Sequence, residues 1–405
     1  MSAFDFGLDS GATYAKDDYD DVNAEFFNDI LRSKTWAALP AGWHNPKSTA
    51  AESFSLQQPS FNDGLQYALD EGYALGDLKE AILNVLGHWE ARPLAWSELT
   101  ICPSVSTANL VVLSALKARG YRHICFESPA YFATPVQADL LGFEVERVTG
   151  KRDGGFEIPV EAFVKSFPGT RKVLWLTQPR FGIGTNQDLG KLRELASFLG
   201  RDDVIVFDEA AEQMFPSVLS ALGLVPCTVL RTRGLMKGIG LNGMRVAAIV
   251  HPDNWRSDME QMLEPCGASL DRFSLKNFAT FADSPALLPS LLEAANGQAQ
   301  RLRKSVELAT VGTWAKPTPL VNGYIGSVIL NLGSLPGDFN AKRHAFLQYC
   351  RTERMPVVLR ASIGFPHDDA WEAIRMNYFT PDENIELSTK ILVSAYECLS
   401  ERLAR

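Results

Sequence analysis

The sequence predicts an α/β fold, in which a mostly parallel sheet flanked by helices forms a large domain and a smaller α+β domain follows it. From about residue 77, short apolar runs rich in Val, Ile, Leu and Phe alternate with stretches of helical periodicity. This alternation is typical of strand–helix–strand units, whose crossover helices cover both faces of a parallel sheet. The pattern changes after about residue 280, which indicates a second domain of different architecture. A mixed α+β fold throughout is the alternative.

Seven apolar runs are the expected strands of the large sheet, and they lie at 99–102, 123–126, 143–148, 173–176, 204–207, 228–230 and 246–250. Amphipathic stretches between them predict helices, among them 106–118, 136–141 and 187–199.

The last third begins with one long amphipathic stretch, 287–308, which predicts a helix near the domain boundary. After it we expect strands at 327–332, 357–359 and 373–376, a helix near 339–350 and a final helix from Asn384. The chain then divides into an N-terminal arm (1–50) that packs on the small domain or on a partner, a large domain (51–285) and a small domain (286–405).

Composition excludes several classes of protein. The 405 residues include 39 Lys and Arg against 48 Asp and Glu, so the net charge of 39 − 48 = −9 argues against a nucleic-acid binder. No run of eighteen apolar residues predicts a membrane span, and the acidic N-terminus does not resemble a secretory signal.

The six cysteines and six histidines show no ligand spacing and no Cys-x-x-Cys pair, which argues against a metal site and a disulfide framework. Reduced thiols in a cytoplasmic protein are the expected state.

One glycine-rich segment holds a lysine and an arginine at a fixed spacing. It reads R-T-R-G-L-M-K-G-I-G-L-N-G-M-R from Arg231, so that Lys237 precedes Arg245 by eight residues. A lysine in such a loop can form a Schiff base with an aldehyde, and an arginine nearby can bind a phosphate through two parallel hydrogen bonds. Without further context, a solvated loop lysine and a surface arginine would be the favoured interpretation of this pair.

Three further segments give this lysine a context. Asp208 ends an apolar strand, at the edge where α/β proteins bind ligands. The residues Ser104, Val105, Ser106 and Thr107 open a helix after another strand, and a helix N-terminus suits a phosphate. Tyr131 follows a third strand and could stack on a flat ring. Taken singly, Asp208 could also be a helix cap, the turn that starts at Ser104 could be a plain N-cap, and Tyr131 could pack in the core.

Taken together and in this order, the segments resemble the class I/II aminotransferases, a family of fold-type I enzymes dependent on pyridoxal 5′-phosphate. The resemblance implies that Lys237 forms the Schiff base and that Asp208 holds the pyridine nitrogen protonated. It further implies that Tyr131 stacks on the cofactor ring and that Arg245 binds the phosphate. The phosphate-binding turn is then formed by Val105, Ser106 and Thr107 together with Ser104.

The resemblance also extends to the substrate and to a second subunit. The segment Ala373-Ile-Arg375-Met-Asn is similar to the small-domain strand whose arginine binds the α-carboxylate of the amino-acid substrate. The resemblance implies a homodimer, and in family members a tyrosine of the partner subunit often contacts the phosphate. Tyr67 has the spacing of that tyrosine, and Tyr73 competes with it.

At three positions the sequence departs from the family pattern. Phe181 replaces an asparagine and Ala211 a tyrosine, both of which donate hydrogen bonds to the phenolic oxygen of the cofactor, and Gly234 replaces a phosphate-binding serine. Loss of both donors should raise the pKa of the Schiff-base linkage, because the phenolate is less stabilised. Gln178, Arg180 and Asn186 are candidates for substitute donors.

We therefore expect an enzyme that acts at the α-amino group or Cα of an amino acid, with transamination as the family default. The altered cofactor environment keeps elimination or replacement, cyclisation and oxidative deamination open as alternatives. A non-catalytic regulator with the same fold is disfavoured, since the first 70 residues show no basic helical unit for DNA binding.

The sequence leaves two interpretations for Arg231 and Arg233. They either face the opening of the cofactor site or are solvated at the end of a strand.

Overall fold

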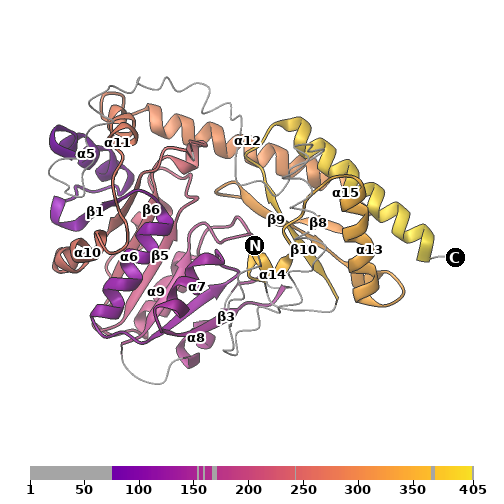
Figure 1. Cartoon of the computed structure of the whole chain (residues 1–405), viewed down its shortest axis with the longest axis horizontal. Coiled ribbons are helices and arrows are strands. Elements are labelled where there is room, and N and C mark those ends of the chain that lie inside the picture. Colours follow the sequence, from indigo (N-terminus) through magenta and orange to yellow (C-terminus); the bar gives the residue numbers. More distant parts are fainter. Residues whose placement is uncertain are drawn as a thin grey trace, which may run out of the picture.

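The computed structural model describes residues 75–152, 155–157, 160–166, 171–241, 243–365 and 370–403. The expected N-terminal arm (1–50), Tyr67 and Tyr73 lie outside these residues. Two sheets stand side by side in Figure 1, and the long helix α12 (Leu287–Ala309) runs along both.

The larger sheet has seven strands in the order β1-β7-β6-β5-β4-β2-β3. The strands span β1 (Leu99–Cys102), β2 (His123–Ser128), β3 (Glu144–Thr149), β4 (Val173–Thr177), β5 (Val204–Glu209), β6 (Thr228–Gly234) and β7 (Ala247–Val250). Only β7 runs against its neighbours, pairing antiparallel with both β1 and β6. This confirms the predicted fold class, and every expected strand of this sheet forms.

Helices cover both faces of this sheet because its central strands are apolar on both sides. In β5, Val204 and Val206 pack in one core with residues of α6 (Val105–Ala118) and α10 (Arg256–Leu263). Ile205 and Phe207 face the other core, which includes residues of α8 (Val160–Ser166) and α9 (Leu189–Ser197). The remaining helices of this part are α5 (Lys79–Trp89), α7 (Ala133–Leu140) and α11 (Arg272–Ala279).

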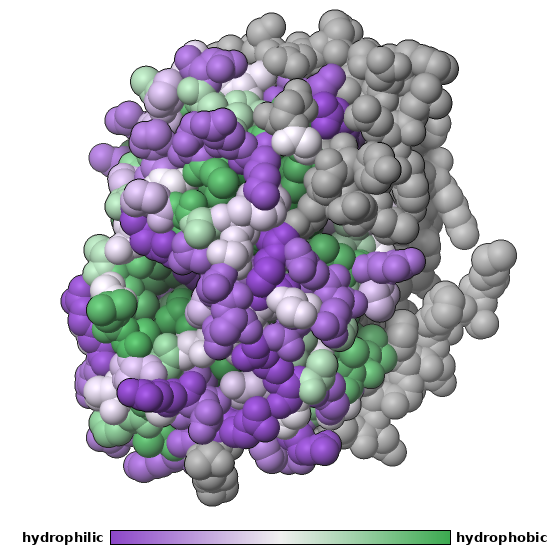
Figure 2. Space-filling view, turned by 90° about the vertical axis from the view of Figure 1, so that its left-hand side faces the viewer, coloured by the Kyte–Doolittle hydropathy of each residue, from purple (hydrophilic) through white to green (hydrophobic). Residues whose placement is uncertain are grey.

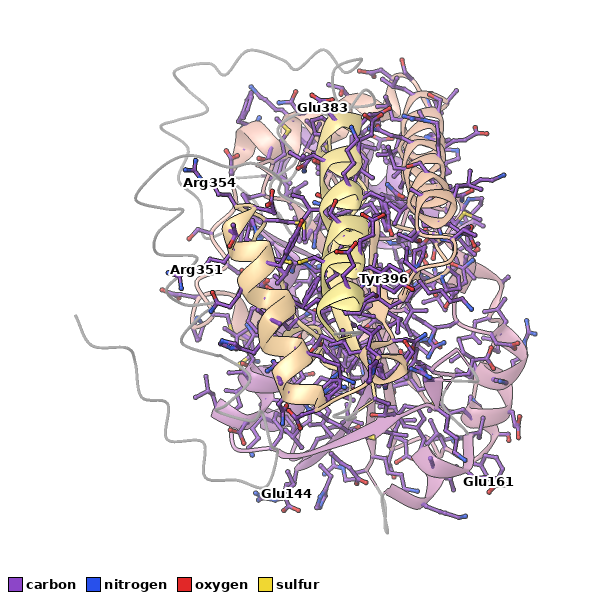
Figure 3. The ribbon with its side chains drawn as sticks, turned by 90° about the vertical axis from the view of Figure 1, so that its right-hand side faces the viewer. Glu144, Glu161, Arg351, Arg354, Glu383 and Tyr396 are labelled. Carbon is purple, nitrogen blue, oxygen red and sulfur yellow. The ribbon has the colours of Figure 1, made fainter. Side chains whose placement is uncertain are left out.

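The smaller sheet is antiparallel and has the order β10-β9-β8, with strands β8 (Ala315–Pro317), β9 (Ile325–Leu330) and β10 (Glu372–Asn377). Its helices are α13 (Phe339–Thr352), α14 (Arg360–Ile363) and α15 (Asp382–Leu403). Figure 3 shows α13 and α15 side by side. Tyr396 of α15 packs there on Trp314, with 6.1 Å between the ring centroids.

The strand expected at 357–359 does not form. Only Leu359 makes an isolated bridge, to Ile374, and α14 begins at the next residue. The start of α14 is held by Glu372, whose Oε1 accepts a hydrogen bond from the backbone N–H of Arg360 at 3.0 Å. The segment is thus held beside β10 by a few hydrogen bonds but does not continue the sheet as a strand.

A close seam joins the smaller sheet to the larger part of the molecule. The backbone N–H groups of Val321 and Asn322 both donate to the carbonyl of Gly184, at 2.7 and 3.1 Å. Gly184 has a φ of +80°, and a Cβ there would lie 2.5 Å from Leu320 Cδ1, so the approach requires glycine. The seam places β9 directly beside the ends of β4 and β5.

Within the described ranges, no helix is long and apolar enough to cross a membrane. On the face drawn in Figure 2, the hydrophobic areas are separated by a broad hydrophilic band.

Candidate active site

A cavity of about 420 Å³ opens at the carboxyl ends of the parallel strands, between the two sheets. This is the edge at which α/β sheets bind ligands. Seven residues of the predicted cofactor site line it, namely Ser104, Val105, Ser106, Tyr131, Asp208, Lys237 and Arg245. They come from segments as far apart as residues 105 and 245, which the sheet brings together.

The other three predicted residues do not line this cavity. Thr107 instead completes the N-cap of α6, since its N–H donates to Ser104 Oγ at 3.1 Å. Arg375 lies behind the cavity on β10 with 3% of its surface exposed, within electrostatic range of Lys237 and Tyr131. Tyr67 is outside the described residues.

Asp208 is held at the end of β5 by two hydrogen bonds. Asn109 Nδ2 donates to Oδ2 at 2.9 Å, and the backbone N–H of Ala210 donates to Oδ1 at 3.0 Å. Burial raises the pKa of Asp208, while Asn109, Ala210 and Lys237 act in the opposite direction. A carboxylate in this position therefore favours a cationic group in the cavity beside it.

Lys237 begins a single 3₁₀ turn, Lys237–Ile239, three residues after Gly234, where β6 ends. The turn closes on Gly240, whose φ of +83° is readily adopted only by glycine. Burial lowers the pKa of the Lys237 ammonium; Asp208 opposes this, while Arg375 and Arg245 reinforce it. A lowered pKa increases the fraction of neutral amine, which is the nucleophilic form.

The N-terminus of α6 also lines the cavity. Ser104 is the N-cap, and the first intrahelical bond runs from Ala108 N to its carbonyl at 2.8 Å. The N–H groups of Val105 and Ser106 belong to the first turn, which carries the positive end of the helix dipole. With the exposed Arg245 also lining the cavity, this end suits an anion such as a phosphate.

The three departures from the family pattern also lie at the cavity. Phe181 packs edge-on against Tyr131, with 6.1 Å between ring centroids, and Ala211 lines the same cavity. A Cβ at Gly234 would lie 2.9 Å from the carbonyl oxygen of Ala210. The ends of β5 and β6 thus approach too closely for a serine at this position.

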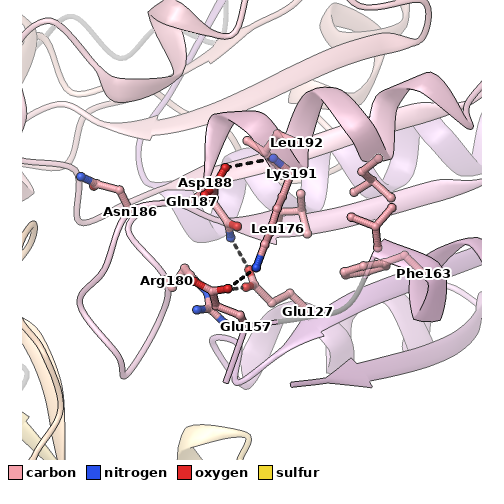
Figure 4. A pocket seen from close by; sticks show the side chains of 12 residues that line it. Glu127, Glu157, Phe163, Leu176, Arg180, Asn186, Gln187, Asp188, Lys191 and Leu192 are labelled. Atoms are coloured by element: carbon pink, nitrogen blue, oxygen red, sulfur yellow. Dashed lines mark hydrogen bonds and ion pairs between the residues drawn. The ribbon is translucent and has the colours of Figure 1, made fainter. Parts of the chain in front are cut away.

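The suggested substitute donors bind other groups. Gln178 Nε2 donates to Asn186 Oδ1 at 2.9 Å and to the buried Glu212 at 3.1 Å. Arg180 borders the cavity, but its Nε binds Glu127 at 2.8 Å. That ion pair belongs to a second, smaller pocket (Figure 4). In this arrangement the Phe181 side of the cavity remains apolar.

Both interpretations offered for Arg231 and Arg233 are wrong. The two guanidinium groups are buried with two carboxylates, those of Glu90 and Glu209, on the side of the strands that faces away from Asp208. Arg233 binds Glu90 at 2.7 Å and Glu209 at 2.9 Å. We call these four residues the buried ion cluster, and it fixes the strand ends that carry Asp208 and Lys237.

Sequence analysis overlooked Asn109. It is fully buried in α6 and connects Asp208 to β6, because its Oδ1 accepts a hydrogen bond from Thr232 Oγ1 at 2.7 Å. An asparagine in the otherwise apolar run Ala108-Asn-Leu-Val-Val was the available signal.

Comparison with known proteins decides the family. The sequence model described as aminotransferase class I and II matches residues 72–307, more than half of the chain. The chain belongs to this family. In the part of the chain described here, no group of three His, Cys, Asp or Glu residues could hold a metal ion.

Aminotransferases also appear among the relatives and the solved structures. Histidinol-phosphate aminotransferases of Halorubrum lacusprofundi and Halobacterium salinarum are 30% and 29% identical over 144 and 127 residues, or 35% and 29% of this chain. These matches span only 38% and 34% of those relatives.

The fold is similar to aspartate aminotransferase of Thermus thermophilus with maleate, at a TM-score of 0.74 and 17% identity, covering 92% and 95% of the two chains. It is likewise similar to an aromatic aminotransferase of Pyrococcus horikoshii, at 0.71 and 16%, covering 93% and 99%.

Proposed function

We propose that this protein is a pyridoxal 5′-phosphate-dependent aminotransferase acting on the α-amino group of an amino acid. The observation that carries the proposal is the half-buried lysine, Lys237, sharing one cavity with the buried carboxylate Asp208. The cavity suits the cofactor in two respects. Asp208 favours a cationic ring nitrogen, and the N-terminus of α6 with Arg245 favours a phosphate. Tyr131 lines the same cavity and supplies an aromatic ring.

When bound, the cofactor supplies an electron sink for negative charge that develops at Cα. The protein supplies the rest. Lys237 in its neutral form holds the cofactor aldehyde and, once released, accepts and returns the proton at Cα. Asp208 keeps the ring nitrogen charged, and Asn109 orients Asp208.

Arg375 is the proposed anchor of the substrate carboxylate. Burial lowers the pKa of its guanidinium to about 9, with Tyr131 and Tyr324 opposing this. A buried cation of this kind gains by pairing with an anion, so binding of a carboxylate compensates its desolvation. The carboxylate is thereby held at a fixed distance from Lys237, which orients the bond to be broken.

A second reaction class is favoured by one observation. Phe181 and Ala211 line the cavity, the donor groups of Gln178 and Arg180 bind other residues, and Asn186 does not line the cavity. The phenolic oxygen then has fewer donors, which is the basis for elimination or replacement, cyclisation or oxidative deamination as the alternative to transamination.

One experiment separates the two. The holoenzyme is mixed with a panel of amino acids, with and without a 2-oxo acid, and the products are followed by mass spectrometry. Transamination requires the oxo acid for turnover and yields a new amino acid. Release of ammonia or a cyclised product without an oxo acid would instead support the alternative.

The domain division and the assembly are part of the proposal. We place the large domain at 51–285 and the small domain at 286–405, with α12 entering the small domain. A homodimer would complete the cavity, in which Arg245 is exposed, with a tyrosine such as Tyr67 from the partner.

A further inference from the structure

Ser327 of β9 is the residue directly opposite Arg375 of β10. The backbone of Ser327 forms its hydrogen bonds on the side away from β10, with Thr318. Thr318 N donates to Ser327 O at 2.8 Å, and Ser327 N donates to Thr318 Oγ1 at 3.0 Å. Arg375 N likewise donates away from Ser327, to Val358 O at 2.9 Å. The two residues are therefore a non-hydrogen-bonded pair, in which opposing side chains lie closest together on one face of the sheet.

That face is turned toward the candidate active site. Ile325, two residues before Ser327 on the same side of β9, lines the cavity. A Cβ at Gly182 would lie 3.3 Å from Ser327 Oγ, and Gly182 follows the cavity residue Phe181. The serine hydroxyl thus sits between the Arg375 strand and the turn that carries Phe181.

The hydroxyl of Ser327 is fully buried and has no hydrogen-bond partner among the residues that the structure describes. A buried hydroxyl without a partner is unfavourable, and such groups are uncommon in folded proteins. The neighbouring hydroxyl of Thr318 is satisfied, since it accepts from Ser327 N. A carboxylate accepts hydrogen bonds from a hydroxyl and from a guanidinium, so these two neighbouring donors suit a carboxylate ligand.

We propose that Ser327 is a second anchor of the substrate, donating its hydroxyl hydrogen to the carboxylate that Arg375 binds. This inference rests on the proposed function, because it assumes a carboxylate-bearing substrate at Arg375. On the large-domain side Phe181 offers only an apolar ring. Both polar contacts to the carboxylate would then come from adjacent positions of the small sheet, which makes the site selective for ligands that carry this group.

The test uses the holoenzyme with Ser327→Ala, Arg375→Leu as the variant that removes the main anchor, and Ser388→Ala as the control. Ser388 is also a fully buried serine, but it lies on α15 and its Oγ donates to Asn384 O at 2.7 Å. The probes are acetate, succinate and 3-phenylpropionate, whose binding is followed through the cofactor absorbance. The amines ethylamine and 2-phenylethylamine serve as ligands without a carboxylate.

Ser327→Ala should weaken binding of the tightest carboxylate about tenfold, the usual effect of one hydrogen bond to a charged group, and leave amine binding unchanged. Ser388→Ala should change neither. An equal loss for amines and carboxylates, or no loss for carboxylates while Arg375→Leu abolishes their binding, would overturn the inference alone. If wild-type protein and Arg375→Leu bind carboxylates equally, or neither binds them, the assignment of Arg375 fails first.

Thermal unfolding without ligand gives an independent readout. Because the Ser327 hydroxyl has no partner in the free protein, Ser327→Ala should leave Tm unchanged or raise it. A fall in Tm of more than about 2 °C would show that the hydroxyl makes a structural hydrogen bond, and would contradict the inference.

Discussion

Replacing Arg233 with methionine removes one of the four charges of the buried ion cluster. The side chain of Arg233 is completely buried, pairs with Glu90 and Glu209, and lies over the ring of Trp89 at 4.8 Å. Methionine is of similar length, so the main loss is electrostatic. Two carboxylates would then share the single guanidinium of Arg231. Removing one partner of a buried pair costs about 3–5 kcal/mol, and we expect the free energy of unfolding to fall by this amount.

Urea unfolding of wild type and Arg233→Met at one fixed protein concentration measures the change, since assembly would shift the midpoint. The control is Arg301→Met. Arg301 binds Asp382 at 2.7 Å, but both side chains are about half exposed, so its loss should cost no more than about 1 kcal/mol. Adding Glu90→Gln to Arg233→Met rebalances the charge and should recover part of the stability. If Arg233→Met costs no more than Arg301→Met, the cluster does not hold the ends of β5 and β6.

Four further predictions follow from the same contacts. Burial opposes ionisation of Glu209, but Arg231 and Arg233 outweigh it and lower its pKa from 4.5 to about 2. The cluster should therefore stabilise the protein above pH 4.5 and lose this effect as the pH falls toward 2, and Glu209→Gln should flatten that part of a Tm-against-pH curve. Gly234→Ser should destabilise the protein by about 1–3 kcal/mol in urea, because its Cβ meets the Ala210 carbonyl; a neutral result would show that β5 and β6 separate easily. Asn109→Leu should weaken cofactor binding, measured by quenching of tryptophan fluorescence, since Asp208 loses a donor that lowers its pKa; unchanged affinity would remove Asn109 from the site. In the holoenzyme, an absorbance titration should show the Schiff-base linkage protonated above neutral pH, and deprotonation near pH 7 would mean that another donor serves the phenolic oxygen.

The centre of the large sheet was predictable because β4, β5 and β7 each contain a continuous apolar run. The candidate site was predictable for the same reason, since Asp208 and Lys237 follow such runs and must meet at one sheet edge. The antiparallel direction of β7 was not, because direction depends on pairing between segments distant in sequence. At 357–359 an apolar run makes only one bridge, because α14 begins directly after it, at Arg360.

The buried ion cluster marks the limit of the sequence argument. Arg231 and Arg233 are two residues apart on β6, so both must point to the same side of the sheet. The pattern alone does not predict that Glu90 and Glu209 lie on that side and pair with the arginines, because Glu90 is 141 positions from Arg231 in the sequence. A charged pair next to a glycine-rich loop looks like part of a binding site until its partners are placed. Asn109 and Ser327 were missed similarly, since each gains its meaning only from a neighbour on another segment.

The central claim is that Lys237 holds the cofactor covalently, and reduction of the holoenzyme tests it most directly. Purified protein is treated with borohydride, digested and mapped by mass spectrometry, with Lys237→Ala treated in parallel. We expect one pyridoxyl group on the peptide that contains Lys237, and no such label or visible absorbance band in Lys237→Ala. A pyridoxyl group on any other lysine, or a linkage that persists in Lys237→Ala, would contradict the assignment of the site.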